Sequence, residues 1–524
     1  MLSGPVTRLV KAQVARVGLL RHDLTLGSLL QRAAAVHGDA VMVDQAAEGR
    51  TGVPARVWTV AEAAALVDRW AAALVADGTC PPGGRVVLAM PNSTEQFLAT
   101  LAVSRAGGIP APVNDAMRAE EVAHVVLDAD AALVIRELDE LDAMADRAGI
   151  DEGLGEDRGA DVRVAALFYT SGTTGVPKGA ALTHRGLVGE LGRLAAAPAN
   201  LVISELLVAL PVAHIYGFAA LAAAGIAGVP VRFRPRFRPD ECLNDLTERG
   251  SGAFAGVPAM YRMLEEAGAD DADLSSVRVW ISGADVMPPE LAQRFKRRGA
   301  ALVLPGVGAV GEATFAEGYG MVETGGGAAA KLSPPFVPLG LGEQVGVPLP
   351  GYSFKVLDHD GSEVRLGAIG QLYLRGPGVL EEYWGDADAT AAVLDADGWL
   401  ATGDLVRKGP LGTFTFQGRA KALIKSGGFS VYPLEVETVL ETHPDVLEAG
   451  VVGLPDEHLG EIPVAAVRLA QGSQLSADEL CTWAAAHLSE YKAPRRVVLV
   501  DDLPRTGTNK LQRDELAARL QRLQ

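Results

Sequence analysis

The chain has 524 residues and a formal net charge of −18, and 48% of its residues are hydrophobic while 21% are charged. The acidic balance excludes broad non-specific binding of nucleic acid, which needs cations to displace the phosphate counterions. Three isolated cysteines, Cys80, Cys242 and Cys481, fit neither a disulfide framework nor a zinc site, so we expect a cytoplasmic protein.

The first 21 residues are basic and contain no acid, but they lack the apolar core and cleavage site of a secretory signal. We expect a solvated first helix there, with peripheral contact at an anionic membrane surface as the alternative. The stretch from Leu206 to Val231 has no charged side chain, yet prolines and glycines interrupt it. It therefore predicts a buried strand, a turn, a core helix and a second strand, with no transmembrane span.

Short apolar runs alternate with amphipathic helical patterns along most of the chain. The run Arg85–Ala89 precedes a helical pattern at Thr94–Ala106, and a second pattern at Ala119–Val126 precedes the run Ala132–Ile135. This alternation predicts an α/β fold in which helices cover parallel sheets. The acidic, glycine-containing segment Leu141–Asp161 is expected to form an exposed connection.

The pattern changes around Gly351–Arg375, where the turn Asp360–Gly361 separates closely spaced strands, as in a small antiparallel or barrel-like piece. Beyond Arg419–Lys421 a separate pattern begins. Its expected elements are two helices and two strands, at Pro433–Glu441, Ala477–Leu488, Leu447–Gly453 and Val464–Leu469. We therefore predict an N-terminal lobe of residues 1–418, a hinge at 419–421 and a C-terminal domain of residues 422–524.

The strongest chemical signal is a loop that follows the apolar strand Ala165–Tyr169. Glycines allow backbone N–H groups to approach an anion, hydroxyls donate further hydrogen bonds, and a lysine supplies charge. The expected polyphosphate ligands are Thr170, Ser171, Gly172, Thr173, Thr174, Gly175 and Lys178. The loop is not a Walker A motif, because Lys178 follows a proline and precedes a glycine. A flexible polar turn is the alternative.

The segment Tyr169–Gly179 resembles the signature loop of the adenylate-forming superfamily, which contains acyl-CoA synthetases, carrier-loading adenylation domains and firefly-type luciferases. The resemblance implies the use of ATP, Mg²⁺ and coenzyme A, and a catalytic role for Thr174. It also implies a large lobe of two helix-flanked sheets with a small β-barrel-like subdomain. A smaller, mobile α+β domain would follow, with the active site between the two, and would rotate between two half-reactions.

Further motifs of this family recur in order along the chain. Pro211–Gly217 is similar to the next motif, which implies that His214 is catalytic and lines the acyl pocket with Tyr216. An isolated histidine in such a position would more often be a hydrogen-bonded core residue. The strand end at Gly283 and Ala284 resembles the segment that stacks against adenine.

The motif that begins at Gly318 resembles the family's tyrosine–glycine–glutamate segment. The resemblance implies that Tyr319 flanks the adenine, that Gly320 lines the acyl pocket, and that Glu323 binds the magnesium ion. Glu317 and Gly318 are also expected to contact the nucleotide. The family usually has a threonine where Val322 stands, so one hydroxyl contact to the α-phosphate is lost or supplied elsewhere.

Later motifs carry the resemblance to the C-terminus. Asp404 stands where the family binds both ribose hydroxyls, and charge-assisted hydrogen bonds suit that task. Arg419 fits the second ribose ligand and Lys421 the hinge, although Ala422 replaces the usual acid. Lys425 is expected to contact the nucleotide.

The resemblance also separates two roles for the last part of the chain. Gly427 and Gly428 are implied to line the pantetheine tunnel of CoA ligases, which is the main reason to prefer CoA over a carrier protein. Lys510 stands at the C-terminal lysine motif, although Asn509 replaces the usual glycine, and is implied to contact the carboxylate and the α-phosphate.

A second glycine pattern, Gly306–Gly311, matches a dinucleotide-binding fingerprint but lacks room for a crossover helix, so we expect no NAD site. The sequence therefore predicts an AMP-forming acid–CoA ligase. Its acid would be a medium- or long-chain fatty acid, with an aromatic acid as the second choice. Loading of a separate carrier protein, a luciferase-like oxygenase and a non-catalytic nucleotide-binding protein stay open as alternatives, and the oligomeric state is unknown.

Overall fold

A computed structural model describes residues 23–170, 177–192, 202–337, 344–506 and 510–523. The chain divides into two units, and each is described by itself. Unit 1 comprises Met1–Gly342, Pro348–Tyr352 and Arg375–Gly398. Unit 2 comprises Glu343–Val347, Ser353–Leu374 and Trp399–Gln524. The predicted hinge at 419–421 lies inside unit 2 and stays a prediction.

The main sheet of unit 1 is parallel at its centre and has an antiparallel strand near each edge. Its strands are, in spatial order, β15 (Gly326–Ser333), β14 (Thr314–Met321), β11 (Val279–Gly283), β10 (Ala253–Gly256), β8 (Leu206–Val208), β9 (Val231–Phe233), β1 (Val41–Gln45) and β2 (Arg56–Thr59). The short strand β16 (Val347–Pro348) lies where the chain returns to unit 1.

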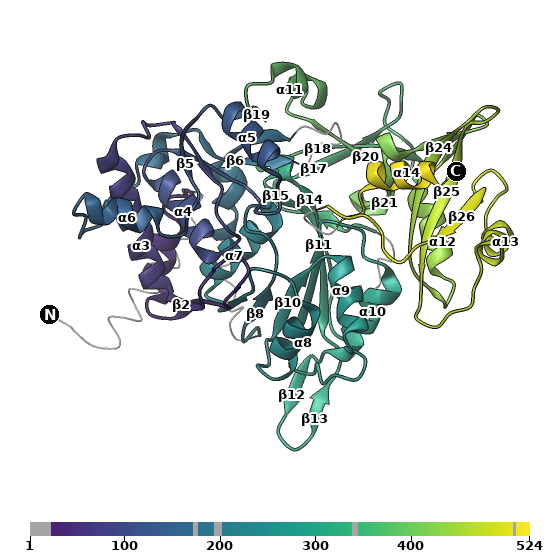
Figure 1. The fold of residues 1–524 in the computed structure, drawn as a ribbon, viewed down its shortest axis with the longest axis horizontal. Helices are drawn as coiled ribbons and strands as arrows, with labels where there is room; N and C mark the ends of the chain where they lie inside the picture. Colours follow the sequence, from purple (N-terminus) through teal and green to yellow (C-terminus); the bar gives the residue numbers. More distant parts are fainter. Residues whose placement is uncertain (1–22, 171–176, 193–201, 338–343, 507–509, 524) are drawn as a thin grey trace. The chain divides into compact units, whose positions relative to one another are not determined.

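Helices connect the parallel strands, as crossover connections in such sheets require. They are α7 (Ile215–Ala227), α8 (Pro239–Thr247), α9 (Pro258–Glu266) and α10 (Pro289–Arg298), and Figure 1 shows the last three beside β10 and β11. Aromatic rings join these layers. Trp280 of β11 lies 5.0 Å from Phe295 of α10 and 6.0 Å from Tyr261 of α9, between ring centroids. Edge-to-face contacts of this kind stabilise a core beyond the area they bury.

The uncharged stretch from Leu206 to Val231 forms β8, α7 and β9, which confirms the predicted strand, turn, core helix and second strand. In the described part of the chain, no helix combines the length and the apolar character that crossing a bilayer requires.

Two three-stranded sheets also belong to unit 1. One is parallel and contains β4 (Ile109–Pro112), β3 (Arg85–Leu88) and β5 (Ala131–Ile135), and the other is antiparallel and contains β19 (Glu382–Tyr383), β7 (Lys178–Thr183) and β6 (Val164–Thr170). Their surrounding helices are α2 (Leu29–His37), α3 (Val60–Asp77), α4 (Thr94–Arg105), α5 (Ala119–Asp128), α6 (Glu140–Arg147) and α11 (Ala387–Val393). Every residue of α4 is buried, so this helix is central to the core.

Two local predictions meet different outcomes. The segment Leu141–Asp161 is not simply an exposed connection, because α6 occupies its start and buries Leu141, Met144 and Ala145. Their i, i+3, i+4 spacing is the signal that the acidic composition concealed.

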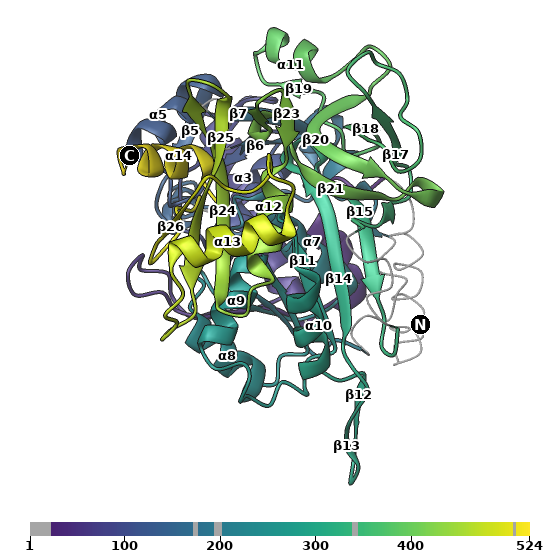
Figure 2. The same ribbon diagram turned by 90° about the vertical axis from the view of Figure 1, so that its right-hand side faces the viewer.

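The glycine pattern Gly306–Gly311 lies in the turn and second strand of a projecting hairpin, β12 (Leu302–Leu304) and β13 (Gly308–Val310) (Figure 2). This antiparallel pairing agrees with the prediction that no crossover helix follows it.

Unit 2 contains two sheets. The four-stranded sheet has the order β17 (Ser353–Leu357), β18 (Ile369–Arg375), β20 (Leu400–Lys408) and β21 (Phe414–Arg419). The five-stranded sheet is built from β23 (Phe429–Val431), β22 (Ile424–Ser426), β25 (Gly460–Leu469), β24 (Val446–Asp456) and β26 (Arg496–Leu499). These two sheets, with the helix-covered sheets of unit 1, confirm the predicted α/β class and its smaller C-terminal α+β part.

Alternating side chains on β24 and β25 build two separate cores. One face packs against α12 (Pro433–Glu441) and α13 (Ala477–His487), and the other packs against α14 (Arg513–Arg522). Val451 and Val452 are neighbours in β24 but belong to opposite cores. The period of two along a strand therefore fixes which helix each face binds.

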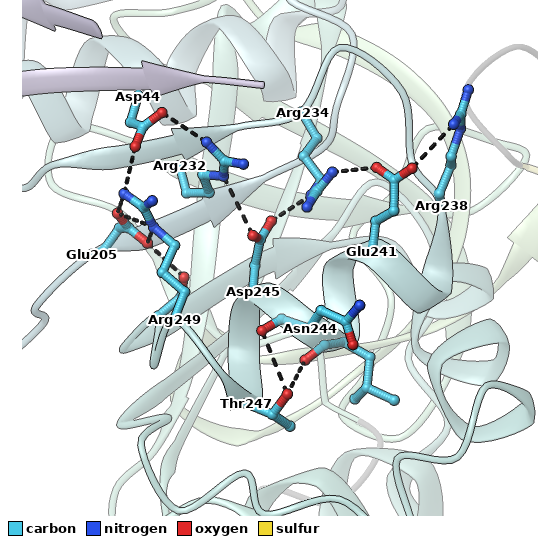
Figure 3. Close-up of polar contacts among 12 residues, drawn as sticks. Asp44, Glu205, Arg232, Arg234, Arg238, Glu241, Asn244, Asp245, Thr247 and Arg249 are labelled. Carbon is cyan, nitrogen blue, oxygen red and sulfur yellow. Dashed lines mark hydrogen bonds and ion pairs between the residues drawn. The ribbon is translucent and has the colours of Figure 1, made fainter. Parts of the chain in front are cut away.

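A chain of ion pairs joins β1, β9 and α8 in unit 1 (Figure 3). We call it the arginine network. Charges of opposite sign alternate along it, in the order Glu205, Arg249, Asp44, Arg232, Asp245, Arg234, Glu241 and Arg238.

Candidate active site

The predicted phosphate loop joins β6 to β7, and the two strands pair so that Thr170 lies opposite Lys178. The predicted ligands Ser171, Gly172, Thr173, Thr174 and Gly175 lie outside the described residues. The loop therefore begins and ends on adjacent strands of one hairpin, which brings its two ends together.

The frame beneath the loop is tightly packed around Tyr169. Its hydroxyl donates a 2.8 Å hydrogen bond to Asp128 of α5, and burial together with this carboxylate raises the pKa of Tyr169 far above its usual value. A Cβ on Gly179 would lie only 2.9 Å from Cζ of the same ring. The Tyr169 ring lies over the backbone of Gly179 and leaves no room for a side chain at that position.

Lys178 forms an ion pair at the end of the loop. Its Nζ donates to Oδ2 of Asp386 at 2.9 Å, and it lies 5.6 Å from the centroid of the Tyr383 ring. Asp386 is the N-cap of α11, because its Oδ1 accepts a 2.8 Å hydrogen bond from the Ala389 backbone. The Ala389 amide and the Lys178 ammonium hold the pKa of the Asp386 carboxyl below its usual range, so it stays ionised.

Glu323 lies in a 3₁₀ turn, Val322–Thr324, directly after β14. The hydroxyl of Tyr383 donates to Oε1 of Glu323 at 2.7 Å, and the Leu380 backbone N–H donates to the Glu323 carbonyl at 2.9 Å. Val322 is buried, with 8% of its surface exposed, so this turn is fixed on both sides.

The structure thus brings together Lys178 and Glu323, which the sequence predicted for phosphate and magnesium. The element between them is the segment Leu380–Asp386, which contains β19 and pairs with β7. Sequence reasoning missed both Tyr383 and Asp386. Asp386 carried a detectable signal, since an aspartate before a helical run is a typical N-cap, but its pairing with Lys178 depends on tertiary structure.

Glu323 fits a magnesium ion of the kind that keeps most of its ligands from water and phosphate. One carboxylate suffices for such an ion. Among the described residues there is no group of three or more His, Cys, Asp or Glu side chains that could enclose a metal. Glu323 therefore suits a magnesium ion that is also held by a polyphosphate. When bound, this ion would neutralise part of the phosphate charge.

The predicted adenine and acyl residues gather at the ends of neighbouring strands. Gly283 of β11 pairs with Gly318 of β14, and a Cβ on Gly283 would lie 3.4 Å from the ring of the half-buried Tyr216. Ala284 follows with a φ of 68°, a left-handed conformation that is uncommon for alanine. Such local strain is often retained at binding sites.

His214 and Tyr216 begin α7. The His214 ring accepts a 3.2 Å hydrogen bond from the Tyr216 backbone through Nδ1, so it acts as the N-cap of the helix. Burial raises the pKa of Tyr216, which keeps its hydroxyl neutral. His214 therefore has a structural task as the N-cap of α7, and its predicted catalytic role stays a prediction.

Glu317, Tyr319 and Gly320 follow one another along β14. Glu317 forms a 2.6 Å ion pair with Lys331 of β15, and burial nevertheless raises the pKa of the Glu317 carboxyl. Tyr319 lies opposite Ala329 on the same partner strand. A Cβ on Gly320 would lie 1.8 Å from the Gly326 carbonyl oxygen, so only glycine allows this close approach.

The predicted ribose ligands meet within unit 2. Asp404 of β20 pairs in register with Arg419 of β21, and the guanidinium Nε lies 2.8 Å from Asp404 Oδ1. The Asp404 side chain is 2% exposed, while that of Arg419 is 48% exposed. A buried carboxylate beside an accessible guanidinium can accept hydrogen bonds from a vicinal diol and donate to its oxygens.

The segment after Arg419 carries the predicted hinge and pantetheine residues. Lys421 lies in the 3₁₀ turn Ala420–Ala422, and Lys425 donates a 2.9 Å hydrogen bond to Ser430. Gly427 and Gly428 join β22 to β23 with φ of 57° and 83°. A Cβ on Gly428 would meet nothing within 4 Å, so the backbone conformation, and not crowding, accounts for this glycine.

Lys510 is hydrogen-bonded to Thr506. The Thr506 backbone N–H donates to the Lys510 carbonyl at 2.8 Å, and the Lys510 N–H donates to the Thr506 hydroxyl at 3.2 Å. The neighbouring Arg505 forms a 2.5 Å ion pair with Glu448 of β24. These bonds fix the backbone on which the Lys510 ammonium is carried.

Comparison with known proteins places this geometry in a family. Residues 30–384 match the model of the AMP-binding enzyme, and residues 435–510 match the AMP-binding enzyme C-terminal domain. Feruloyl-CoA synthase from Amycolatopsis is 32% identical over 482 residues, covering 88% of this chain and 94% of that protein. Indoleacetate–CoA ligase from Aromatoleum aromaticum is 30% identical over 499 residues, covering 89% and 94%.

Other relatives extend the comparison. A fatty acid–[acyl-carrier-protein] ligase, ScoC from Streptomyces coeruleorubidus, is 33% identical over 480 residues, covering 86% of this chain and 89% of that protein. The crystal structure of ATP-bound MatB from Rhodopseudomonas palustris superposes with a TM-score of 0.80 at 29% identity, covering 95% of this chain and 99% of that one.

The chain therefore belongs to the AMP-binding enzyme family, and the predicted membership of the acyl-CoA synthetase branch of the adenylate-forming superfamily is confirmed. It is an AMP-forming acid–thiol ligase. The relatives named as CoA ligases and the ATP-bound neighbour agree with the predicted use of ATP and coenzyme A.

Proposed function

We propose that this enzyme activates a carboxylic acid with ATP and then transfers the acyl group to coenzyme A. The acid's carboxylate displaces pyrophosphate from the α-phosphorus and gives an acyl-adenylate. The CoA thiolate then attacks the acyl carbonyl, and AMP leaves. The observation that carries this proposal is the convergence of Lys178 and Glu323 on one segment of unit 1.

The residues of unit 1 have distinct parts in this proposal. Lys178 neutralises the β- and γ-phosphates, and Glu323 holds the magnesium ion that supplies further charge neutralisation there. Tyr319 flanks the adenine beside Ala284, and Tyr216 and Gly320 line the acyl pocket. The predicted loop hydroxyls, including that of Thr174, donate to the phosphates.

The residues of unit 2 serve both half-reactions. Asp404 and Arg419 bind the ribose, and Lys425 contributes a nucleotide contact. Lys510 stabilises the charge that builds as the carboxylate attacks, whereas Gly427 and Gly428 admit the pantetheine arm. Because these tasks fall in different steps, we also propose residues 419–421 as the hinge between a lobe of residues 1–418 and a domain of residues 422–524.

Two classes of acid are candidates. A medium- or long-chain fatty acid stays the first prediction, and the similarity to a fatty acid–carrier ligase supports it. An aromatic acid is supported by the similarity to relatives named as feruloyl-, indoleacetate- and 4-coumarate-CoA enzymes. The decisive measurement is pyrophosphate release over a panel of both acid classes, with and without CoA.

The acceptor and the catalytic lysine need separate tests. Acyl-CoA should form when CoA is the only thiol, and a product that appears only with a pantetheinylated protein would overturn the choice of CoA.

Lys510→Ala should slow acid-dependent ATP–pyrophosphate exchange by about a hundredfold or more, because one preorganised charge donor is lost. Unchanged exchange across all active acids would remove Lys510 from the first step.

A further inference from the structure

The segment Leu380–Asp386 contacts both of the charged groups that the proposed function assigns to the polyphosphate. It pairs with β7 beside Lys178 through Glu382 and Tyr383, and its Leu380 N–H bonds to the backbone of Glu323. Two of its side chains then reach the charged groups themselves. Together Lys178, Glu323, Tyr383 and Asp386 form what we call the β19 cluster.

Asp386 uses its two carboxylate oxygens for different tasks. Oδ1 accepts the Ala389 N–H and caps α11, while Oδ2 accepts from the Lys178 ammonium. An asparagine could keep the first bond, since asparagine and aspartate cap helices about equally well. Its remaining group would be an NH₂, which cannot accept a hydrogen bond from an ammonium. The capping and ion-pairing tasks of Asp386 are therefore separable by a single substitution.

The ion pair is accessible to an incoming anion. The Lys178 side chain is 34% exposed and that of Asp386 is 42% exposed. Exposed pairs of this kind are weak, so a polyphosphate can displace the carboxylate. Because Asp386 stays ionised, its charge also repels any anion that binds Lys178.

Whereas Asp386 opposes the binding of an anion at Lys178, Tyr383 favours the binding of a metal ion at Glu323. Its hydroxyl donates to Oε1, which fixes the rotamer of the carboxylate and leaves Oε2 as the other ligand oxygen. Hydrogen bonds to a metal-binding carboxylate orient it, and losing one typically weakens metal affinity or activity by about tenfold or more.

We propose that the β19 cluster sets the affinity of the enzyme for magnesium polyphosphate through two opposed contacts: Tyr383 positions Glu323 for the metal, and Asp386 holds Lys178 until a polyphosphate displaces it. When pyrophosphate leaves, Asp386 recaptures the ammonium and favours release of this product. The inference rests on the proposed function, because it takes Lys178 and Glu323 as ligands of magnesium polyphosphate.

The test is the binding of magnesium pyrophosphate to the full-length enzyme, measured by isothermal titration calorimetry. Asp386→Asn should tighten binding by about two- to fivefold, and this gain should shrink at high salt because it is electrostatic. Tyr383→Phe should weaken binding of Mn²⁺ by about tenfold, measured by electron paramagnetic resonance in the presence of a non-hydrolysable ATP analogue. Structural damage alone would weaken binding in both variants.

Two further variants keep the outcome clear. Asp388→Asn removes the same charge from an exposed position in the first turn of α11, and it should change pyrophosphate affinity by less than Asp386→Asn. If Asp386→Asn folds poorly, Asp386→Ser retains a capping oxygen and should give the same gain. Unchanged or weaker pyrophosphate binding in the folded Asp386 variants overturns the role of Asp386, and unchanged Mn²⁺ binding in Tyr383→Phe overturns that of Tyr383. Failure of the wild-type enzyme to bind pyrophosphate or the ATP analogue would instead overturn the proposed function.

Discussion

The arginine network and the β19 cluster are both built from ion pairs in unit 1, but they differ in how the charges are shared. In the arginine network, Asp245 lies between Arg232 and Arg234, and only 8% of its side chain is exposed. In the β19 cluster, Lys178 forms a single ion pair among the described residues. Its side chain is 34% exposed, and that of its partner Asp386 is 42% exposed. The first arrangement ties elements together, whereas the second leaves charge available to a ligand.

The difference has an energetic basis. Removing one member of a buried pair leaves an uncompensated charge in the protein and costs several kcal/mol, while an exposed pair contributes little to stability. Ion pairs of similar length can therefore serve opposite purposes. The comparison teaches that shared, buried carboxylates indicate a structural network, and that a partly exposed lysine with one ion-pair partner indicates a binding group.

Breaking the arginine network should have the largest effect, and the effect should be on stability. Asp245→Asn removes the charge that Arg232 and Arg234 share, so we expect a loss of about 3 kcal/mol in the free energy of unfolding. Urea denaturation measures this loss. Asp240→Asn, at an exposed position of the same helix, should cost far less. Equal losses in the two variants would contradict a structural role for the network.

Removing Lys178 should instead affect activity and leave stability nearly unchanged. Lys178→Ala should reduce acid-dependent ATP–pyrophosphate exchange by about a hundredfold, because a charge that neutralises phosphate is lost. The same variant sharpens the comparison in a double-mutant cycle. The gain in pyrophosphate affinity from Asp386→Asn should vanish when Lys178 is absent, and additive effects would show that the two side chains act independently.

Much of the fold follows from local sequence signals. The helix Pro433–Glu441 agrees with the structure at both ends, because a proline at the first helical position marks its start. The strand before the phosphate loop was also predictable, since its apolar run is bounded by loop residues. The helix α6 was missed because acidic residues surround the buried positions Leu141 and Met144.

The candidate site was predictable only in part, for a different reason. Lys178, Glu323, Asp404 and Lys510 were identified one by one from motifs along the chain. The side chains that contact these residues are not encoded locally. Asp386 contacts Lys178, and Tyr383 contacts Glu323, only because β19 pairs with β7. Sequence motifs indicate which groups do chemistry, whereas tertiary packing decides which groups hold them.

The packing under the phosphate loop predicts a smaller effect on stability. Gly179→Ala would place a Cβ 2.9 Å from the Tyr169 ring, which the bond to Asp128 holds in place. We expect a loss of about 1–2 kcal/mol in the free energy of unfolding, as for other overpacked cores. Gly318→Ala is the control, since a Cβ there would meet nothing within 4 Å. A loss in the control as large as that in Gly179→Ala would rule out the steric explanation.

The smallest effect concerns pH and a histidine outside both clusters. His184 accepts the Leu26 N–H through Nδ1 at 2.9 Å, and its Nε2 lies 3.0 Å from the Gly159 carbonyl and 3.1 Å from that of Val162. Burial lowers the pKa of His184, so the folded protein favours the neutral ring. The contribution to stability is therefore complete above the unfolded pKa of about 6.5 and is lost as pH falls through the lower folded value.

The free energy of unfolding should fall more between pH 7.5 and 5.5 in the wild type than in His184→Asn, whose side chain does not titrate. Parallel curves would mean that His184 gains its proton at the same pH in the folded and unfolded states, which would contradict a ring held neutral by burial.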